Sequence, residues 1–181
     1  NPIMVPITRK GLASSWMQEV GCGHCLGCRK DQKRDWTIRI MHEASMHDDS
    51  WFVTLTYDDE RIPRDRSVDP KHIRGFIKAL RRDYPPRSLS YYAVGEYGET
   101  TSRPHYHAVL FGADFPDRIY LGDRNGNPVW KSPHLESHWS YGFTEFSTLT
   151  PASAAYTAGY VQKKLRLRDH ENAFTRCDPE T

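Results

Sequence analysis

Two histidines of the chain, His105 and His107, stand two positions apart in a run of residues that favours a β-strand. Side chains of a strand alternate between the two faces of a sheet, so both imidazoles should point to the same side. Two neighbouring imidazoles on a rigid strand are well placed to bind a divalent metal ion. The triplet alone is weak evidence, because two surface or core histidines without any ligand would produce the same pattern.

A carboxylate would complete this ligand set if residues 90–97 and 103–111 are two strands of a hairpin with a turn between them. In that register Glu96 lies opposite His105, with about 5 Å between the two Cβ atoms. Two nitrogens and one carboxylate suit Mn, Mg, Fe or Zn, and the ligand types do not choose among these metals. Glu99, in the turn, is the second choice for the carboxylate. The alternative for Glu96 is an exposed strand residue with no ligand role.

Two tyrosines, Tyr156 and Tyr160, lie four residues apart in a segment that should form a helix from Pro151 to about residue 167. At about 100° per residue, both tyrosines fall on the same face as Lys163. That face is opposite an apolar stripe formed by Ala154, Ala158, Val161 and Leu165. A tyrosine oxygen can attack phosphorus and form a covalent intermediate, and a lysine can offset the charge of the transition state. The alternative is that the tyrosines pack on a neighbouring element.

Three of the four cysteines are clustered, at Cys22, Cys25 and Cys28. Two thiolates in a C-x-x-C spacing can chelate zinc, and a third strengthens this interpretation. No fourth ligand is evident, and the candidates are Cys177, His24 and His42. The alternative is a group of reduced, buried cysteines. Because this is not the dispersed pattern of a disulfide framework, it indicates a reducing, cytoplasmic setting.

Basic residues gather in two segments, although the net charge of the chain is only +2. Residues 71–87 contain six bases against one acid, and residues 163–168 contain four bases and no acid. Clustered bases on a near-neutral chain fit a local site for a polyanion. The expected DNA-binding side chains are Lys71, Arg74, Lys78, Arg81 and Lys164. The alternative for each cluster is a solvated helix face.

The positions of the predicted elements indicate one domain with an α+β fold, since strand pairs joined by hairpins give an antiparallel sheet with helices packed on it. Helices are predicted over about residues 26–46, 70–84, 134–139 and 151–167, and strands over 51–57, 90–97, 103–111 and 142–149. Asp69 should cap the second helix, because proline follows it at the first helical position. The strand at 51–57 is apolar almost throughout and should therefore be central in the sheet. Residues 11–28 and 112–133 are expected to be irregular, and residues 169–181 to form a linker or tail. No segment approaches the ~18 apolar residues of a membrane span, and no signal peptide is visible.

Three of these segments together resemble the HUH-endonuclease family of replication initiators, and most closely the initiators of gokushovirus-type single-stranded DNA phages. The family has an apolar strand rich in threonine, matched by residues 52–57, and paired histidines, matched by residues 103–107. Its third motif is a tyrosine helix with Y-x-x-K, matched by residues 160–163, and phage members carry a second tyrosine one turn earlier. The segments 22–36 and 41–44 also resemble the gokushovirus group, so that the likeness covers most of residues 20–165.

The resemblance implies a five-stranded antiparallel sheet flanked by helices, of the ferredoxin-like split βαβ type, over a catalytic domain at 1–168 with a tail at 169–181. It implies Mg or Mn held by His105, His107 and the acidic residue eight or nine positions earlier, which selects Glu96. It also implies nicking and joining of single-stranded DNA at an origin sequence or hairpin, with a 5′-phosphotyrosine and a free 3′-hydroxyl. The expected setting is the cytoplasm of an infected bacterium, with host replication proteins as further partners.

One departure from the family pattern concerns the residue just before the second tyrosine, which is usually basic and here is Gly159. Tyr156 therefore has no lysine three positions on, whereas Tyr160 has Lys163. We accordingly expect Tyr160 to make the first cut and Tyr156 to serve in strand transfer or termination.

Two other classes of protein fit part of the pattern. A metal oxygenase with two histidines and one carboxylate would explain the ligand set, but it takes its second histidine from a distant strand and gives no role to the tyrosine helix. A non-enzymatic DNA-binding module with a zinc knob would explain the bases and cysteines, but not the two histidines and Glu96. A covalent protein–DNA adduct would separate both from a nickase.

Overall fold

A computed structural model of the chain describes residues 2–8, 15–23, 25–85, 88–98, 100–165 and 175–177. For residues 2–3, 5–8, 15–16, 161–165 and 175–177 only the backbone is described. Expectations for His24 and Glu99, and for the side chains of Lys163, Lys164 and Cys177, therefore lie outside the described residues.

The structure contains every predicted helix and strand. It also contains five strands that the sequence did not predict: two near the N-terminus, two between residues 119 and 131, and one at residues 175–177. The helices are α1 (Leu26–Ala44), α2 (Pro70–Leu80), α3 (Pro133–His138) and α4 (Pro151–Leu165), with a 3-10 turn at Arg81–Asp83. The strands are β1 (Pro2–Thr8), β2 (Ser15–Gly21), β3 (Ser50–Tyr57), β4 (Ser90–Tyr97), β5 (Pro104–Phe111), β6 (Ile119–Arg124), β7 (Asn127–Lys131), β8 (Gly142–Thr148) and β9 (Thr175–Cys177). The Asp69 side chain accepts a hydrogen bond from the backbone of Lys71 and so caps α2 as expected.

A seven-stranded sheet with the order β6-β7-β8-β3-β5-β4-β9 forms the body of the molecule, and its neighbouring strands all run antiparallel. The predicted α+β class is confirmed, and β3 lies at the centre of the sheet, as its apolar sequence indicated. The expected number of five strands was too low. The sheet is larger because the β6–β7 hairpin extends one edge and β9 extends the other.

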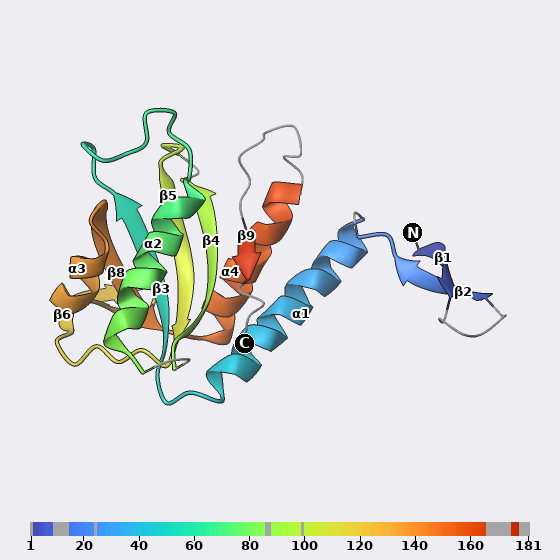
Figure 1. Cartoon of the computed structure of the whole chain (residues 1–181), viewed down its shortest axis with the longest axis horizontal. Coiled ribbons are helices and arrows are strands. Elements are labelled where there is room, and N and C mark those ends of the chain that lie inside the picture. The colour runs from blue at the N-terminus through green and yellow to red at the C-terminus, as the bar shows by residue number, and fades with distance from the viewer. Residues whose placement is uncertain are drawn as a thin grey trace.

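One face of the sheet is covered by α2 and α3 (Figure 1). Alternate residues of β3 and β5 point to this side, among them Val53, Leu55, Tyr106 and Ala108. They form the main core with an apolar stripe of α2 and with Leu135 and Trp139 of the α3 region. Burial of these side chains from water is the main force that fixes the two helices on the sheet.

The opposite face of the sheet is covered by α1 and α4, which pack on each other as well as on the strands (Figure 1). A second core cluster joins Ile40 of α1 and Ala158 of α4 to Tyr92, Val109 and Phe111 of the sheet. The small residues of α4 allow close approach, so that the first part of the predicted apolar stripe, Ala154 and Ala158, is fully buried. The paired histidines also lie on this second face, and the ring of His107 lies beside those of Tyr156 and Tyr160 of α4.

Two predictions of irregular structure were wrong where the structure describes the residues. The segment 112–133 contains the β6–β7 hairpin, which turns at Asn125 and Gly126 with φ values of 52° and 75°. An Asn-Gly pair is a strong signal for such a turn and could have predicted it. Residues 15–21 form β2, which pairs with β1 in a separate two-stranded sheet beyond the N-terminal end of α1 (Figure 1). Residues 175–177 pair with β4.

Among the helices that the structure describes, none has the length and apolar character required to cross a membrane.

Candidate active site

The hairpin of β4 and β5 pairs Glu96 with His105, which is the register predicted from the sequence. His107 lies two residues further along β5 on the same face. The Glu96 Oε2 atom lies 3.2 Å from His107 Nε2 and 3.5 Å from His105 Nε2. One ligand atom from each of the three residues lies within 4.8 Å of the other two, so the structure brings together the predicted ligand set.

The hydrogen bonds around the two rings show which nitrogens can act as ligands. His105 Nδ1 lies 3.0 Å from the backbone oxygen of Arg103, and because a carbonyl only accepts, Nδ1 must donate. A neutral His105 therefore presents the lone pair of Nε2 to Glu96. His107 Nδ1 lies 3.2 Å from the hydroxyl of Thr54, its partner across the β3–β5 ladder. Such partners hold metal-binding histidines in position in other proteins.

The Glu96 carboxylate is buried, with 6% of its surface exposed, and among the described residues its Oε2 atom receives no hydrogen bond. A buried carboxylate oxygen that faces imidazole lone pairs is unfavourable unless a proton or a cation lies between them. Burial by itself raises the pKa of Glu96. When the Nε2 atoms of His105 and His107 carry protons, however, they donate to the carboxylate, and this lowers its pKa to about 2. Burial lowers the pKa of His107. An ionised carboxylate beside neutral imidazoles is the charge state that binds a divalent cation.

The tyrosine helix places both predicted tyrosines against this ligand set. Tyr160 donates a hydrogen bond of 2.8 Å from its hydroxyl to that of Tyr156. The ring of His107 lies 5.2 Å from the ring of Tyr156 and 6.2 Å from that of Tyr160, measured between centroids. The pKa of Tyr160 is raised because its hydroxyl is buried and lies against the negative carboxylate of Glu96.

The two tyrosines differ in their access to solvent. Tyr160 is 6% exposed, whereas Tyr156 is 44% exposed and lines a cleft of about 700 Å³. The cleft runs along the histidine-bearing face of the sheet, between the first turns of α4 and the β6–β7 hairpin. Its lining includes Phe52, Thr54, His105, His107, Arg124, Asn125, Asn127 and Ser153. The cleft therefore joins the metal-ligand set to open solvent.

The expected DNA-binding bases of α2 are not brought near this cleft. Lys71, Arg74 and Lys78 are exposed on α2, and Arg81 follows in the 3-10 turn. Since α2 covers one face of the sheet and α4 the other, the sheet separates these bases from the tyrosines. The two helices do not share a face of the sheet, because the alternation of β5 side chains assigns the histidines to the face away from α2. DNA binding by the α2 bases stays a prediction.

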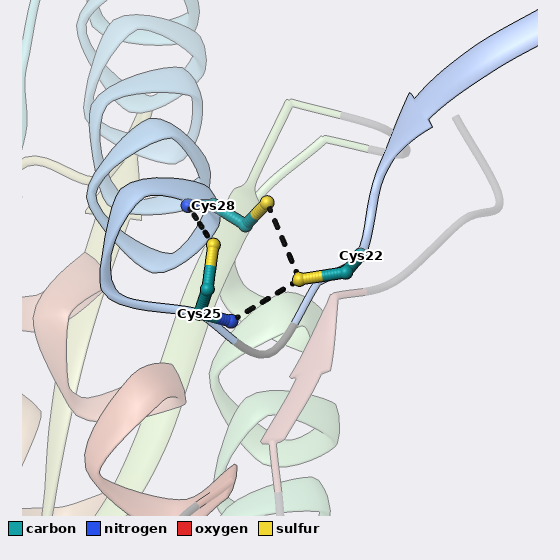
Figure 2. Close-up of side chains that lie close together, drawn as sticks. All are labelled: Cys22, Cys25 and Cys28. Carbon is teal, nitrogen blue, oxygen red and sulfur yellow. Dashed lines mark hydrogen bonds between the residues drawn. The ribbon is translucent and has the colours of Figure 1, made fainter. Parts of the chain in front are cut away.

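The three clustered cysteines come together at the N-terminal end of α1 (Figure 2). The backbone N–H of Cys25 donates to Cys22 Sγ at 3.4 Å, and that of Cys28 donates to Cys25 Sγ at 3.5 Å. The Sγ atoms of Cys22 and Cys28 are 3.9 Å apart. These hydrogen bonds, above all the one from Cys28, lower the pKa of Cys25 to about 6. His42 is not a fourth ligand, because it lies about 20 Å further along the helix by the rise per residue.

Two residues near the site were not singled out from the sequence. Thr54 could have been found from its position in the threonine-rich strand, because the ladder places it beside His107. Phe143 lies in the same row of the sheet as Thr56 and His105, and it is 66% exposed. The sequence alone does not reveal that Phe143 lies beside the ligand set, because this position follows only from the strand register.

Comparison with known proteins gives one family and several relatives. A family model described as replication-associated protein ORF2/G2P matches residues 50–165. The chain is 36% identical over 161 residues to replication-associated protein ORF2 of Spiroplasma virus 4, which covers 84% of this chain and 50% of that protein. It is 37% identical over 157 residues to replication-associated protein VP4 of Bdellovibrio phage phiMH2K, which covers 80% of this chain and 48% of that protein.

A third relative is replication-associated protein ORF4 of Chlamydia phage 1, with 32% identity over 152 residues, 80% of this chain and 38% of that protein. The chain thus spans about half the length, or less, of the curated relatives that it matches. No solved structure matches the chain.

Proposed function

The chain belongs to the family of replication-associated proteins ORF2/G2P and is of the gokushovirus type, and from this premise we propose that it nicks single-stranded DNA with a tyrosine to start replication. A replication initiator implies DNA as the partner. The observation that carries the nicking chemistry is the position of the Tyr160 and Tyr156 hydroxyls, hydrogen-bonded to each other beside His107 and Glu96. A nucleophile beside a metal-ligand set is the arrangement that phosphoryl transfer requires.

His105, His107 and Glu96 would hold one divalent cation, with Mg or Mn as the expected metal. The fit rests on the orphaned Oε2 atom of Glu96 and on the Nε2 lone pair that His105 directs toward it. When bound, the cation would polarise the scissile phosphate and offset the charge that develops on its oxygens.

The chain's own residues would carry out the transfer. The tyrosine oxygen forms a bond to phosphorus as the bond from phosphorus to the 3′-oxygen breaks, and the departing oxygen takes up a proton to become the 3′-hydroxyl. The product is a 5′-phosphotyrosine, and the phenolic proton leaves to water, either directly or by relay through the neighbouring hydroxyl, which passes on its own proton. Because the phosphodiester is exchanged rather than hydrolysed, the same step run in reverse rejoins the strand.

We assign the first cut to Tyr160 and the later transfer to Tyr156. The Tyr160 hydroxyl lies against Glu96 itself, so a phosphate held at the ligand set lies within its reach, and Lys163 follows three residues later. Tyr156 is the more exposed of the two and faces the cleft, where an incoming strand would arrive. A second nucleophile one helical turn away lets the enzyme exchange one covalent strand for another.

The DNA strand would lie in the cleft beside α4. Side-chain amides of Asn125 and Asn127 offer hydrogen bonds to phosphates and bases there. Phe143 is exposed in the same row of the sheet as His105 and offers a surface on which a base can stack. Arg124 lines the same cleft but is engaged in an ion pair with Glu145, so it must exchange partners before it can neutralise a phosphate.

A structural zinc ion at Cys22, Cys25 and Cys28 is the second metal that we propose. Two thiolate sulfurs that each lie about 2.3 Å from a tetrahedral zinc ion are about 3.8 Å apart. This is close to the distance between the sulfurs of Cys22 and Cys28. The N–H groups that point at two of the sulfurs stabilise thiolates (Figure 2). Zinc content of the purified protein, before and after Cys28→Ser, tests this proposal. A zinc-free wild-type protein that binds none on addition would contradict it.

The decisive experiment for nicking uses a library of single-stranded oligonucleotides that share a fluorescent label at the 3′ end. The covalent protein stays on the downstream fragment, so an active enzyme with Mn²⁺ shifts the label to a slow band on a denaturing gel. The Tyr156→Phe/Tyr160→Phe variant should give no band, while Tyr120→Phe, which changes an exposed tyrosine of β6, should act like wild type. A labelled adduct in the double variant would contradict the nucleophile assignment.

Mass spectrometry of the trapped peptide then separates the two tyrosines. We expect the DNA on Tyr160 in the wild type, no adduct in Tyr160→Phe, and an adduct without efficient rejoining in Tyr156→Phe. An adduct on Tyr156, with Tyr160→Phe still active, would reverse the order and leave the reaction class standing.

A further inference from the structure

A third group of side chains that could bind a metal lies on the other side of the sheet from the tyrosines. Asp83 closes the 3-10 turn that follows α2, and His134 and His138 both lie on α3. Their spacing of four residues places the two imidazoles on one face of the helix. The Asp83 Oδ2 atom lies 2.7 Å from His134 Nε2 and 2.6 Å from His138 Nε2. One ligand atom from each residue lies within 4.8 Å of the other two.

The short helix that carries the histidines is held firmly at both ends. At its start, the Ser132 hydroxyl accepts from the backbone of Leu135, and Asp117 accepts both from Ser132 and from the backbone N–H of His134. At its end, Trp139 is buried and donates from its indole to the backbone oxygen of Thr56 at 3.0 Å. Each histidine therefore stands next to a residue that is anchored in the core, Leu135 or Trp139.

We propose that Asp83, His134 and His138 bind one divalent cation of the zinc class, which fastens α3 to the end of α2. Two imidazole nitrogens and one carboxylate oxygen are ligands that zinc accepts, with water in the fourth position. In the metal-free form each Nε2 can donate a proton to the shared oxygen. Binding requires that each ring carry its proton on Nδ1 instead, so that both Nε2 lone pairs and the carboxylate face the ion. It also requires the two nitrogen–oxygen contacts to lengthen, because ligand atoms about 2.0 Å from a tetrahedral zinc lie about 3.3 Å apart.

This site is separate from the one that we assign to nicking. α3 and the end of α2 cover the face of the sheet opposite to the paired histidines. A cation here cannot reach a phosphate at Tyr160, and its role would be to hold two surface elements together. The inference does not rest on the proposed nicking function, and the two can fail independently.

Zinc binding by the whole chain, counted by native mass spectrometry after removal of metals with a chelator, tests the proposal. We expect His134→Ala/His138→Ala to bind one zinc ion fewer than the wild type. Asp83→Asn retains an oxygen that accepts from the histidines but loses the charge, so it should fold normally and bind this ion at least about tenfold more weakly. His42→Ala, which removes an exposed histidine of α1, should match the wild type.

Thermal unfolding provides the second measurement, because an ion that binds only the folded chain raises the melting temperature. Zinc should raise it less in Asp83→Asn than in the wild type, while nicking with Mn²⁺ stays at the wild-type rate. Equal zinc stoichiometry and equal zinc-dependent stabilisation in the wild type and Asp83→Asn would overturn the proposal. Loss of nicking in Asp83→Asn would instead show that the group acts on the catalytic site and would overturn its separation from it.

Discussion

Thr54 provides the sharpest test of the metal site, because its hydroxyl contacts a ligand without being one. The Thr54 Oγ1 atom lies 3.2 Å from His107 Nδ1 and leaves the Nε2 atom of that ring facing Glu96. Thr54→Val keeps the shape of the side chain and removes only this partner. His107 would then be free to turn, and its Nδ1 atom would be buried without a hydrogen bond.

The expected loss can be estimated from the two effects of that hydrogen bond. Partners that orient a metal-binding histidine typically contribute a factor of about 10 to 100 in metal affinity. This corresponds to about 1.4 to 2.7 kcal/mol of binding free energy. The free energy of unfolding should fall by about 1 to 3 kcal/mol, the usual cost of leaving a buried polar group without its hydrogen-bond partner. Mn²⁺ affinity, measured by isothermal titration calorimetry, should therefore fall while the protein remains folded.

Thr56→Val is the matched control, since Thr56 lies on the same strand and the same face of the sheet, opposite His105. His105 directs its Nδ1 atom to the backbone oxygen of Arg103, which the substitution leaves in place. Mn²⁺ affinity should change by less than about threefold in Thr56→Val. Equal affinities in the two variants would refute the argument that Thr54 orients a ligand.

Three further predictions concern other parts of the chain. Hydrogen bonding from Cys28 lowers the pKa of Cys25 to about 6. Alkylation of Cys25 by iodoacetamide in the metal-free protein should therefore persist at pH 7 and fall by half near pH 6. A midpoint near pH 9 would contradict the hydrogen-bonded thiolate. Gly112→Ala should lower the free energy of unfolding, measured in urea, by at least about 2 kcal/mol. The reason is that φ is +73° and a Cβ would lie 2.2 Å from the backbone oxygen of Ser88. Gly126 has a φ of +75° and open space around it, so Gly126→Ala should lower the free energy of unfolding by only about 1 kcal/mol. Equal losses in the two variants would refute the steric argument. Neutralising Lys71, Arg74 and Lys78 together should leave cleavage of an oligonucleotide that spans only the cleft unchanged, and a strong loss with such a substrate would place the strand on α2 instead.

The local signals of the sequence were sufficient for the centre of the fold. Asp69 followed by proline marked the start of α2, and the apolar β3 was identified as a central strand. The turn between residues 90–97 and 103–111 set the hairpin register, and with it the approach of Glu96 to His105. These features depend on residues close together in the chain, where period and turn chemistry act directly.

The edges of the fold were missed because they depend on contacts between distant residues or on strands with a weak local pattern. β9 consists of only three residues and is formed by pairing with β4. The paired residues are about eighty positions apart in the sequence, and no local pattern predicts such a contact. The β6–β7 hairpin was not predicted, because its strands are short and mostly exposed. The Asn125-Gly126 pair does indicate its turn. Exposed strands carry little of the apolar alternation from which a strand is predicted.

By itself, the sequence determined which residues have the chemistry: two histidines on one strand face, a carboxylate across the hairpin, and two tyrosines on one helix face. Only the tertiary structure decided how these faces meet. Packing of Ala154 and Ala158 against the sheet turns Tyr160 into the ligand set and leaves Tyr156 at the cleft, and the pleat of β5 puts α2 and its bases on the far side. The physical reason is that side-chain period fixes a face within each element, whereas the face that each element buries is set by apolar contacts among all of them.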